Sequence, residues 1–305
     1  HIARAESIFC YNYHMNGVKE VIGADVSTCK IEELISTDVI VMVGTNVMEE
    51  HASLGVAVRK GVNNGAKLIV INNVPESQEA KEADIYIQSD STDGIREIMK
   101  ALIEEGAKPE DVATPEEAKK FRESLEGLEI SDKARAAAKI LMKEKKAIVV
   151  TDQFNLSHEG EKAAADLAVL SGHIGNPRNG ILQIKTNVNT QGLANLGISP
   201  VCVMKEKLRG GVFKSIFIIG EDVYGFDRSN MDFVAVADLY MTETAKKADV
   251  VYPLVSLFES TGMVVSMDGT IHEIEKVVKP KAKSNVAAIA IIANAMKSNF
   301  HYNSS

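Results

Sequence analysis

The fold is decided by one stretch near the start of the chain, residues 38–46, which reads DVIVMVGTN. Its centre is an unbroken run of apolar, mostly β-branched residues, as in a strand covered on both faces of a parallel sheet. A glycine and two short polar residues follow, and residues 52–62 then have helical spacing. The stretch therefore predicts a strand, a loop and a helix of an α/β fold.

The same plan recurs along the chain. Further strands are expected at residues 67–71, 84–87, 147–150, 181–184, 215–219, 233–237 and 249–252. Between two groups of strands lies a segment rich in Glu, Lys and Ala, in which Thr114 and Pro115 are suited to begin a helix. We predict two Rossmann-like parallel-sheet lobes, residues 1–105 and 146–305, joined by a helical connector at 106–145.

The composition of the chain excludes several classes of protein. The chain has 305 residues, 45% of them hydrophobic, and a formal net charge of -8, which indicates globular material and argues against nucleic-acid binding. Cys10, Cys29 and Cys202 lie too far apart for a disulfide framework or a CxxC zinc site, so a cytoplasmic location is expected. The sequence has no apolar run of about 18 residues, so we expect no direct membrane insertion and only peripheral attachment through partners.

Chemistry in a parallel sheet is expected at the loops after the strands. Gly44, Thr45 and Asn46 follow the first strand, where they could approach a phosphate or ribose or could form a plain tight turn. The chain has no GxGxxG or GxxxxGK[ST] pattern. A standard dinucleotide fingerprint and a P-loop are therefore excluded.

The second half offers further polar loops. Residues 171–180 combine three glycines with a histidine and an arginine, and they suit either a ligand loop or a long surface loop. Amide side chains at 187–192 could bond a pterin or purine edge, and polar residues also follow the strands at 215–219 and 233–237. His158 and Glu159 are expected to begin a helix and face solvent, and no hydrolase arrangement is identified.

These loops resemble the molybdopterin oxidoreductase family, which includes formate dehydrogenase alpha subunits and the large iron-sulfur subunit of NADH:quinone oxidoreductase. The resemblance is carried in family order by residues 37–46 (TDVIVMVGTN), 65–71 (GAKLIVI), 170–177 (LSGHIGNP), 187–192 (NVNTQG), and 242–245 with 248–253 (TETA, ADVVYP). Because the chain starts with His1 and the family's N-terminal cysteine cluster and C-terminal domain have no counterpart, we expect an internal fragment.

The resemblance implies that the lobes bind the two arms of molybdopterin guanine dinucleotide with Mo or W. Residues that would contact one arm are Gly44, Thr45 and Asn46. Residues that would line the other are Gly172, Gly175, Asn187, Gln191, Gly220, Glu221, Asp238 and Thr242. The 4Fe-4S centre would lie in other parts of the parent protein, and the isolated fragment is expected to hold no cofactor and to be inactive.

Two positions depart from the family pattern. The family's Ile-Asp-Pro-Arg after the second strand is Ile71-Asn72-Asn73-Val74 here, without the acid and the arginine. Cys10 matches the catalytic metal ligand of formate dehydrogenases, but Tyr11 follows it where the family has histidine. Cys10 could ligate the metal or be a buried, inert thiol.

These departures favour the core of a redox subunit in an NADH-linked electron-transfer complex, as a cofactor-free scaffold like the NADH:quinone oxidoreductase large subunit. The alternative is a fragment of a bis-pterin formate dehydrogenase catalytic subunit. A stand-alone nucleotide-binding protein is an alternative of another class. The expected partners are other domains of the parent chain and iron-sulfur or NADH-linked subunits.

Overall fold

A computed structural model describes Ile8 and residues 17–75, 77–185, 187–198, 206–208 and 210–295. The chain divides into two compact units. The larger unit comprises Met15–Gly192 and Val265–Thr270, and the smaller unit comprises Leu193–Val264 and Ile271–Ser305 with His1–His14.

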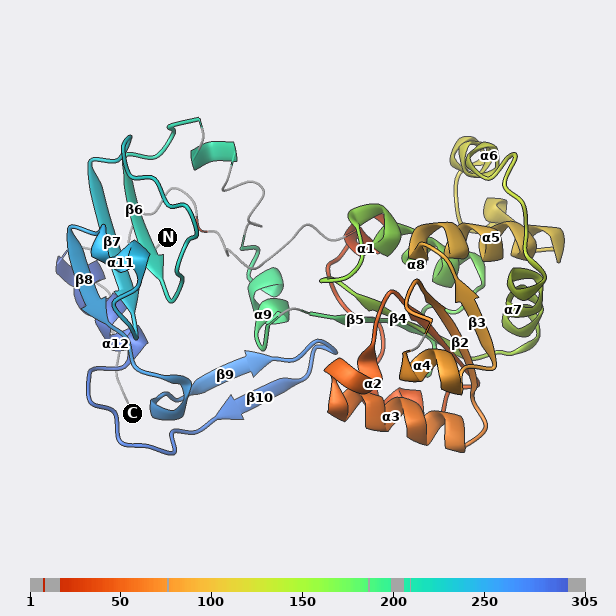
Figure 1. The fold of residues 1–305 in the computed structure, drawn as a ribbon, viewed down its shortest axis with the longest axis horizontal. Coiled ribbons are helices and arrows are strands. Elements are labelled where there is room, and N and C mark those ends of the chain that lie inside the picture. The colour runs from red at the N-terminus through yellow and green to blue at the C-terminus, as the bar shows by residue number, and fades with distance from the viewer. Residues whose placement is uncertain are drawn as a thin grey trace. The chain divides into compact units, whose positions relative to one another are not determined.

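The larger unit is built on a five-stranded parallel sheet with the strand order β3-β2-β1-β4-β5 (Figure 1). The strands are β1 (Val39–Val43), β2 (Lys67–Asn72), β3 (Ile85–Gln88), β4 (Ala147–Asp152) and β5 (Gly180–Ile184). All five residues of β1 are buried, as the unbroken apolar run predicts. The α/β fold class is thus confirmed, and every strand lies where its run was expected.

Helices cover both faces of this sheet. Successive side chains of β1 point to opposite faces, so β1 packs against the helices on both sides. Val39, Val41 and Val43 pack in one cluster with residues of α5, α7 and α8. Ile40 and Met42 point to the other face and pack with residues of α3. The helices and 3-10 turns of this unit are α1 (Val18–Ile22), η1 (Ile31–Ile35), α2 (Val47–Glu50), α3 (Ala52–Asn63), α4 (Gln78–Glu82), α5 (Ser91–Glu104), η2 (Pro109–Asp111), α6 (Pro115–Ser124), α7 (Asp132–Lys143), α8 (His158–Leu170) and, at the boundary with the smaller unit, α9 (Thr190–Asn195).

The structure divides the chain elsewhere than at the expected boundaries of 105 and 145. β4 pairs with β1, so the strands expected to open a second lobe extend the first sheet instead. The expected connector contains α6 and α7, and Ala134, Ala138 and Leu141 on α7 are buried in the core of the larger unit. The helical prediction for this segment is correct in structure, with Thr114 forming a capping box with Glu117, but the segment packs against the sheet rather than linking lobes.

The smaller unit holds a parallel sheet with the order β6-β7-β8, formed by β6 (Ser215–Ile219), β7 (Phe233–Asp238) and β8 (Val250–Pro253). Its core contains Ile218, Val234, Val236, Phe226 and Ala245. A two-stranded sheet of β9 (Gly262–Val265) and β10 (Ile271–Ile274) was not predicted. The remaining elements are α11 (Glu243–Lys246), η3 (Leu257–Glu259) and α12 (Asn285–Ala295). Among the described residues, every helix is too short or too polar to cross a bilayer.

Candidate functional site

The first candidate site lies at the carboxyl edge of the larger sheet, between β1 and β4. From β1 the chain proceeds to β2 on one side, and from β4 it proceeds to β5 on the other, so the strand order reverses between these two central strands. Open parallel sheets bind ligands at such a switch point, in the crevice outside the carboxyl ends of the strands. The loops after β1 and β4 are therefore the ones that the fold places at a ligand site.

Gly44, Thr45 and Asn46 form the β1 side of this switch point. Gly44 has a φ of 61°, and a Cβ added there would lie 2.5 Å from Cδ2 of Leu156, in the loop after β4. Only glycine fits this position, because the conformation is left-handed and the neighbouring loop packs directly on it. Thr45 is 1% exposed, and its hydroxyl oxygen has no partner among the described residues. Such an orphaned hydroxyl is the kind of group that a ligand or an ordered water satisfies.

Asn72, at the end of β2, stands where the family pattern has an acid. Its Nδ2 group donates to the carbonyl oxygen of Thr45 and to Oδ1 of Asn46, both at 3.2 Å. Its Oδ1 atom accepts from the backbone N–H groups of Asn73, at 2.7 Å, and Val74, at 3.3 Å. A side-chain amide offers two donors and two acceptor positions, so the protein itself uses all four. Asn72 ties the β1 and β2 loops together and has no bond left for a nucleotide.

The β5 end of the same edge holds a buried network of charges. Lys185, directly after β5, forms an ion pair with Asp25, and the two side chains are 2% and 5% exposed. Burial lowers the pKa of Lys185, and the Asp25 carboxylate opposes that shift. Gln191 is 1% exposed and donates through Nε2 to the carbonyl oxygen of Asp25 at 2.7 Å. Gln191 therefore positions the Asp25 segment, while Asn187, in the same loop, is exposed.

Glu161 on α8 is a second buried carboxyl near this ion pair. It is 1% exposed; Oε2 accepts from the N–H of Gly17 at 2.9 Å, and Oε1 has no partner among the described residues. Burial raises the pKa of Glu161 to about 7, with a smaller opposing effect of the Gly17 N–H and of Lys185. A carboxyl with this pKa exchanges its proton near neutrality.

Gly172 and Gly175 lie in the loop between α8 and β5, at the amino end of β5. They are therefore at the opposite edge of the sheet from Gly44. His173 between them is 3% exposed, and its ring nitrogens lie 2.9 Å from the Ser171 hydroxyl and 3.0 Å from the carbonyl oxygen of Glu144. These bonds fix His173 to the protein, and ligand contact by Gly172 and Gly175 stays a prediction.

The second candidate site is the carboxyl edge of the smaller sheet, where Gly220, Glu221, Asp238 and Thr242 follow β6 and β7. Gly220 has a φ of 67° and donates to the carbonyl oxygen of Ala237 at 2.8 Å. Burial, the charge of Asp238 and then that of Asp222 raise the pKa of Glu221. Thr242 caps α11 by accepting from the N–H of Ala245. This edge is acidic, which suits the N–H donors of a base or ribose hydroxyls better than phosphate.

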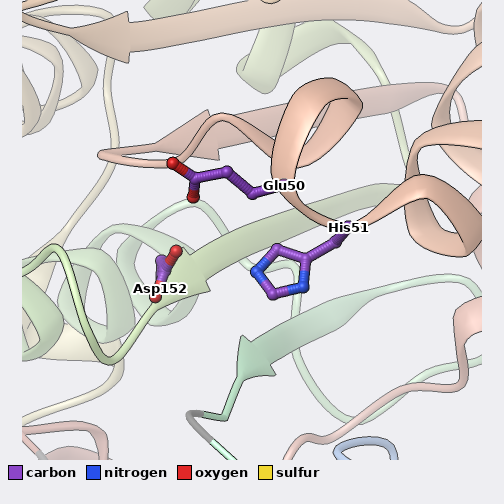
Figure 2. Close-up of side chains that lie close together, drawn as sticks. All are labelled: Glu50, His51 and Asp152. Atoms are coloured by element: carbon purple, nitrogen blue, oxygen red, sulfur yellow. The ribbon is translucent and has the colours of Figure 1, made fainter.

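Three ligand-type side chains at the first edge were not predicted. Glu50, His51 and Asp152 each place one potential metal-binding atom within 4.8 Å of the other two. Figure 2 shows the three side chains at the ends of α2 and β4. The available signal was Asp152, a carboxylate that ends the apolar run of β4, but the pairing of β1 with β4 that brings His51 near it is not visible in the sequence.

The predicted metal position, Cys10, lies outside the described residues. Cys29 is described; it is 5% exposed, and burial raises the pKa of its thiol to about 12. A thiol in this state is protonated at neutral pH and unreactive. Cys29 is therefore a core residue.

A family model and several curated proteins are similar in sequence to most of this chain. The family model for molybdopterin oxidoreductases matches residues 6–293. The alpha subunit of F420-dependent formate dehydrogenase 2 from Methanococcus maripaludis is 25% identical over 322 residues, which cover 86% of this chain and 47% of that protein. Formate dehydrogenase H from Escherichia coli is 24% identical over 365 residues, which cover 94% of this chain and 49% of that protein. The chain thus spans about half the length of these curated relatives.

Two solved structures share the fold. Acetylene hydratase from Pelobacter acetylenicus aligns with a TM-score of 0.65 and 17% identity, covering 92% of this chain and 50% of its own. A chain of the formyltransferase/hydrolase complex from Methylorubrum extorquens, solved with methylofuran, aligns with a TM-score of 0.65 and 13% identity, covering 92% of this chain and 80% of its own. These likenesses concern the fold alone.

Proposed function

Because the chain belongs to the molybdopterin oxidoreductase family, we propose that it is the core of a redox subunit of the formate dehydrogenase type, in which each sheet holds one arm of a molybdopterin guanine dinucleotide cofactor. The observation that carries the proposal is the switch point between β1 and β4, with left-handed Gly44 and the orphaned Thr45 hydroxyl beside it. A nucleotide arm placed there would accept a hydrogen bond from Thr45.

Some residues at the two sheet edges suit a nucleotide arm of the cofactor, and Asn72 does not. Thr45 at the first edge suits a phosphate or ribose oxygen, and Glu221 and Asp238 at the second edge suit the N–H donors of guanine or the hydroxyls of ribose. Asn72 does not fit a base-reading role, because its four hydrogen bonds are made within the protein. When bound, the cofactor would supply two-electron chemistry at its molybdenum or tungsten. This chain's residues would hold its arms and keep the edges ordered.

The saturated Asn72 favours a second candidate, a cofactor-free scaffold of the kind found in the large subunit of NADH:quinone oxidoreductase. In that case the hydrogen bonds of Asn72 hold the loops after β1 and β2 together and leave no space for a nucleotide between them. We also propose that the protein belongs to an NADH-linked complex, has other subunits as partners and lies in the cytoplasm. A metal-ligating role for Cys10 is a further proposal. The matched Methanococcus protein is itself described as a subunit alpha.

Hydrogen exchange of the 305-residue chain with and without guanosine diphosphate tests the proposal. We expect the amides of Thr45 and Asn46 and those after β4 to exchange more slowly with guanosine diphosphate and not with adenosine diphosphate. Protection by neither nucleotide supports the scaffold. Protection by adenine nucleotides alone would support a stand-alone nucleotide-binding protein.

A further inference from the structure

The cluster of Glu50, His51 and Asp152 lies at the switch point but takes no part in the nucleotide contacts proposed above. Glu50 ends α2, His51 connects α2 to α3, and Asp152 is the last residue of β4 (Figure 2). About a hundred residues separate the first two from the third. They meet because β1 and β4 are parallel neighbours in the sheet, with Val43 opposite Thr151.

Asp152 is a buried carboxylate without a cationic side chain to neutralise it. It is 2% exposed, and its oxygens accept from two neutral donors, the N–H of Phe154 at 2.8 Å and Nδ2 of Asn155 at 2.9 Å. Within the described ranges no Lys or Arg forms an ion pair with it, whereas Asp25 at the same edge is paired with Lys185. Burial raises the pKa of Asp152, and His51 opposes the shift while Glu50 adds to it. Buried carboxylates are normally paired or bound to a metal.

The other two side chains converge on Asp152 without bonding to it. No hydrogen bond or ion pair between described residues connects His51 to either carboxylate, although the three ligand atoms lie within 4.8 Å of one another. Ligands held at about 2.0–2.2 Å from one ion lie about 3–4.4 Å apart. The upper limit of 4.8 Å on the separations in the cluster is close to this range, and the exposed Glu50 side chain is free of packing that would stop it from adjusting to an ion.

We propose that Glu50, His51 and Asp152 form a binding site for one divalent first-row transition-metal ion such as Mn²⁺ or Zn²⁺. One imidazole nitrogen and two carboxylate oxygens are a ligand set that suits these ions, and exposure of Glu50 leaves room for water ligands. Two carboxylates and a neutral imidazole carry a charge of about -2, which a divalent ion offsets.

A bound cation would also change what the crevice can accept. Two carboxylates repel a diphosphate, whereas the same groups around a divalent ion present no net negative charge. This consequence rests on the proposed nucleotide function. The metal site does not, since its three ligands all belong to the larger unit.

The test is Mn²⁺ titration of the chelator-treated chain, with free Mn²⁺ followed by its paramagnetic resonance signal and Zn²⁺ added as competitor. We expect one Mn²⁺ per chain, at least tenfold weaker binding in His51→Gln and Asp152→Asn, and displacement by Zn²⁺. Glu50→Gln provides a variant at an exposed position, so that the result does not depend on the folding of a buried substitution. The matched control is His158→Gln, whose ring lies 2.9 Å from the Glu20 carboxylate outside the cluster.

Absence of binding at millimolar Mn²⁺, or equal weakening by His158→Gln, would overturn the metal site. Hydrogen exchange with guanosine diphosphate is a separate measurement on the same preparation. A chain that binds Mn²⁺ but shows no protection by guanosine diphosphate would keep the metal site and count against the cofactor-holding role.

Discussion

The substitution Glu161→Gln removes a buried charge while keeping the shape of the side chain. The pKa of Glu161 is raised from 4.5 to about 7 in the folded protein, mainly by burial. At about 1.4 kcal/mol for each step of one in pKa, this rise corresponds to about 3–3.5 kcal/mol. Since the side chain is 1% exposed, solvent screening reduces this value little.

The sign of the effect follows from proton linkage. Below pH 4.5 Glu161 is protonated in both states and costs nothing. Between 4.5 and about 7 the unfolded state releases its proton while the folded state keeps it, so stability falls as pH rises, and above about 7 the full loss remains. The Gln variant lacks this loss, so we expect it to be more stable than the natural chain by about 3 kcal/mol at pH 8 and by close to nothing at pH 4.5.

Native-state hydrogen exchange of amides in β4 and α8 measures this difference, because their opening free energy reports the stability of the larger unit. The control is Glu159→Gln, an exposed position on the same turn of α8. Glu159 is only a minor cause of the raised pKa of Asp166, so we expect a much smaller change with pH. A Glu161→Gln variant that is equally stable or less stable at pH 8, with the pH slope of the natural chain, would refute the assignment of a buried, destabilising charge.

Three further substitutions test individual contacts. Gly44→Ala places a Cβ 2.5 Å from Leu156 in a left-handed conformation, and we expect chemical denaturation to show a loss of about 2–4 kcal/mol in the free energy of unfolding. The control Gly127→Ala is left-handed with nothing within 4 Å and should lose only about 1 kcal/mol, so equal losses would contradict the packing argument. Asn72→Asp restores the acid of the family pattern but removes the donors to Thr45 and Asn46, so the melting temperature should fall by an amount equivalent to about 2–4 kcal/mol; an unchanged value would show that other contacts hold the two loops. Lys185→Met removes the cation that neutralises buried Asp25 and should lower the free energy of unfolding by about 3–5 kcal/mol. In a double-mutant cycle, adding Asp25→Asn should recover part of this loss. Strict additivity of the two substitutions would contradict a direct ion pair.

The sequence was sufficient for the strands and for the loops after them, because both are local properties. An apolar β-branched run such as residues 39–43 can be buried only as a strand or helix interior, and its flanking Gly44 marks the end. The start of a helix at Thr114 and Pro115 was predictable for the same reason. The hairpin of β9 and β10 was missed because its strands are short and exposed, so the apolar pattern is weak.

Pairing between distant strands could not be predicted in this way. The run at 147–150 has the same composition whether it opens a new sheet or pairs with β1, and only the pairing decides that Lys185, Asn187 and Gly44 share an edge while Gly172 lies at the opposite one. Burial of ionisable groups depends on the same pairing. Asp152 and Glu161 therefore became visible as candidates only in the folded chain.

The most direct test of the cofactor-holding role is metal and pterin analysis of the protein purified at its natural length without oxygen. The proposed function predicts molybdenum or tungsten together with guanine-dinucleotide pterin, in a ratio of two pterins to one metal. Iron alone, with no pterin, would contradict it and would make the two sheets a cofactor-free scaffold.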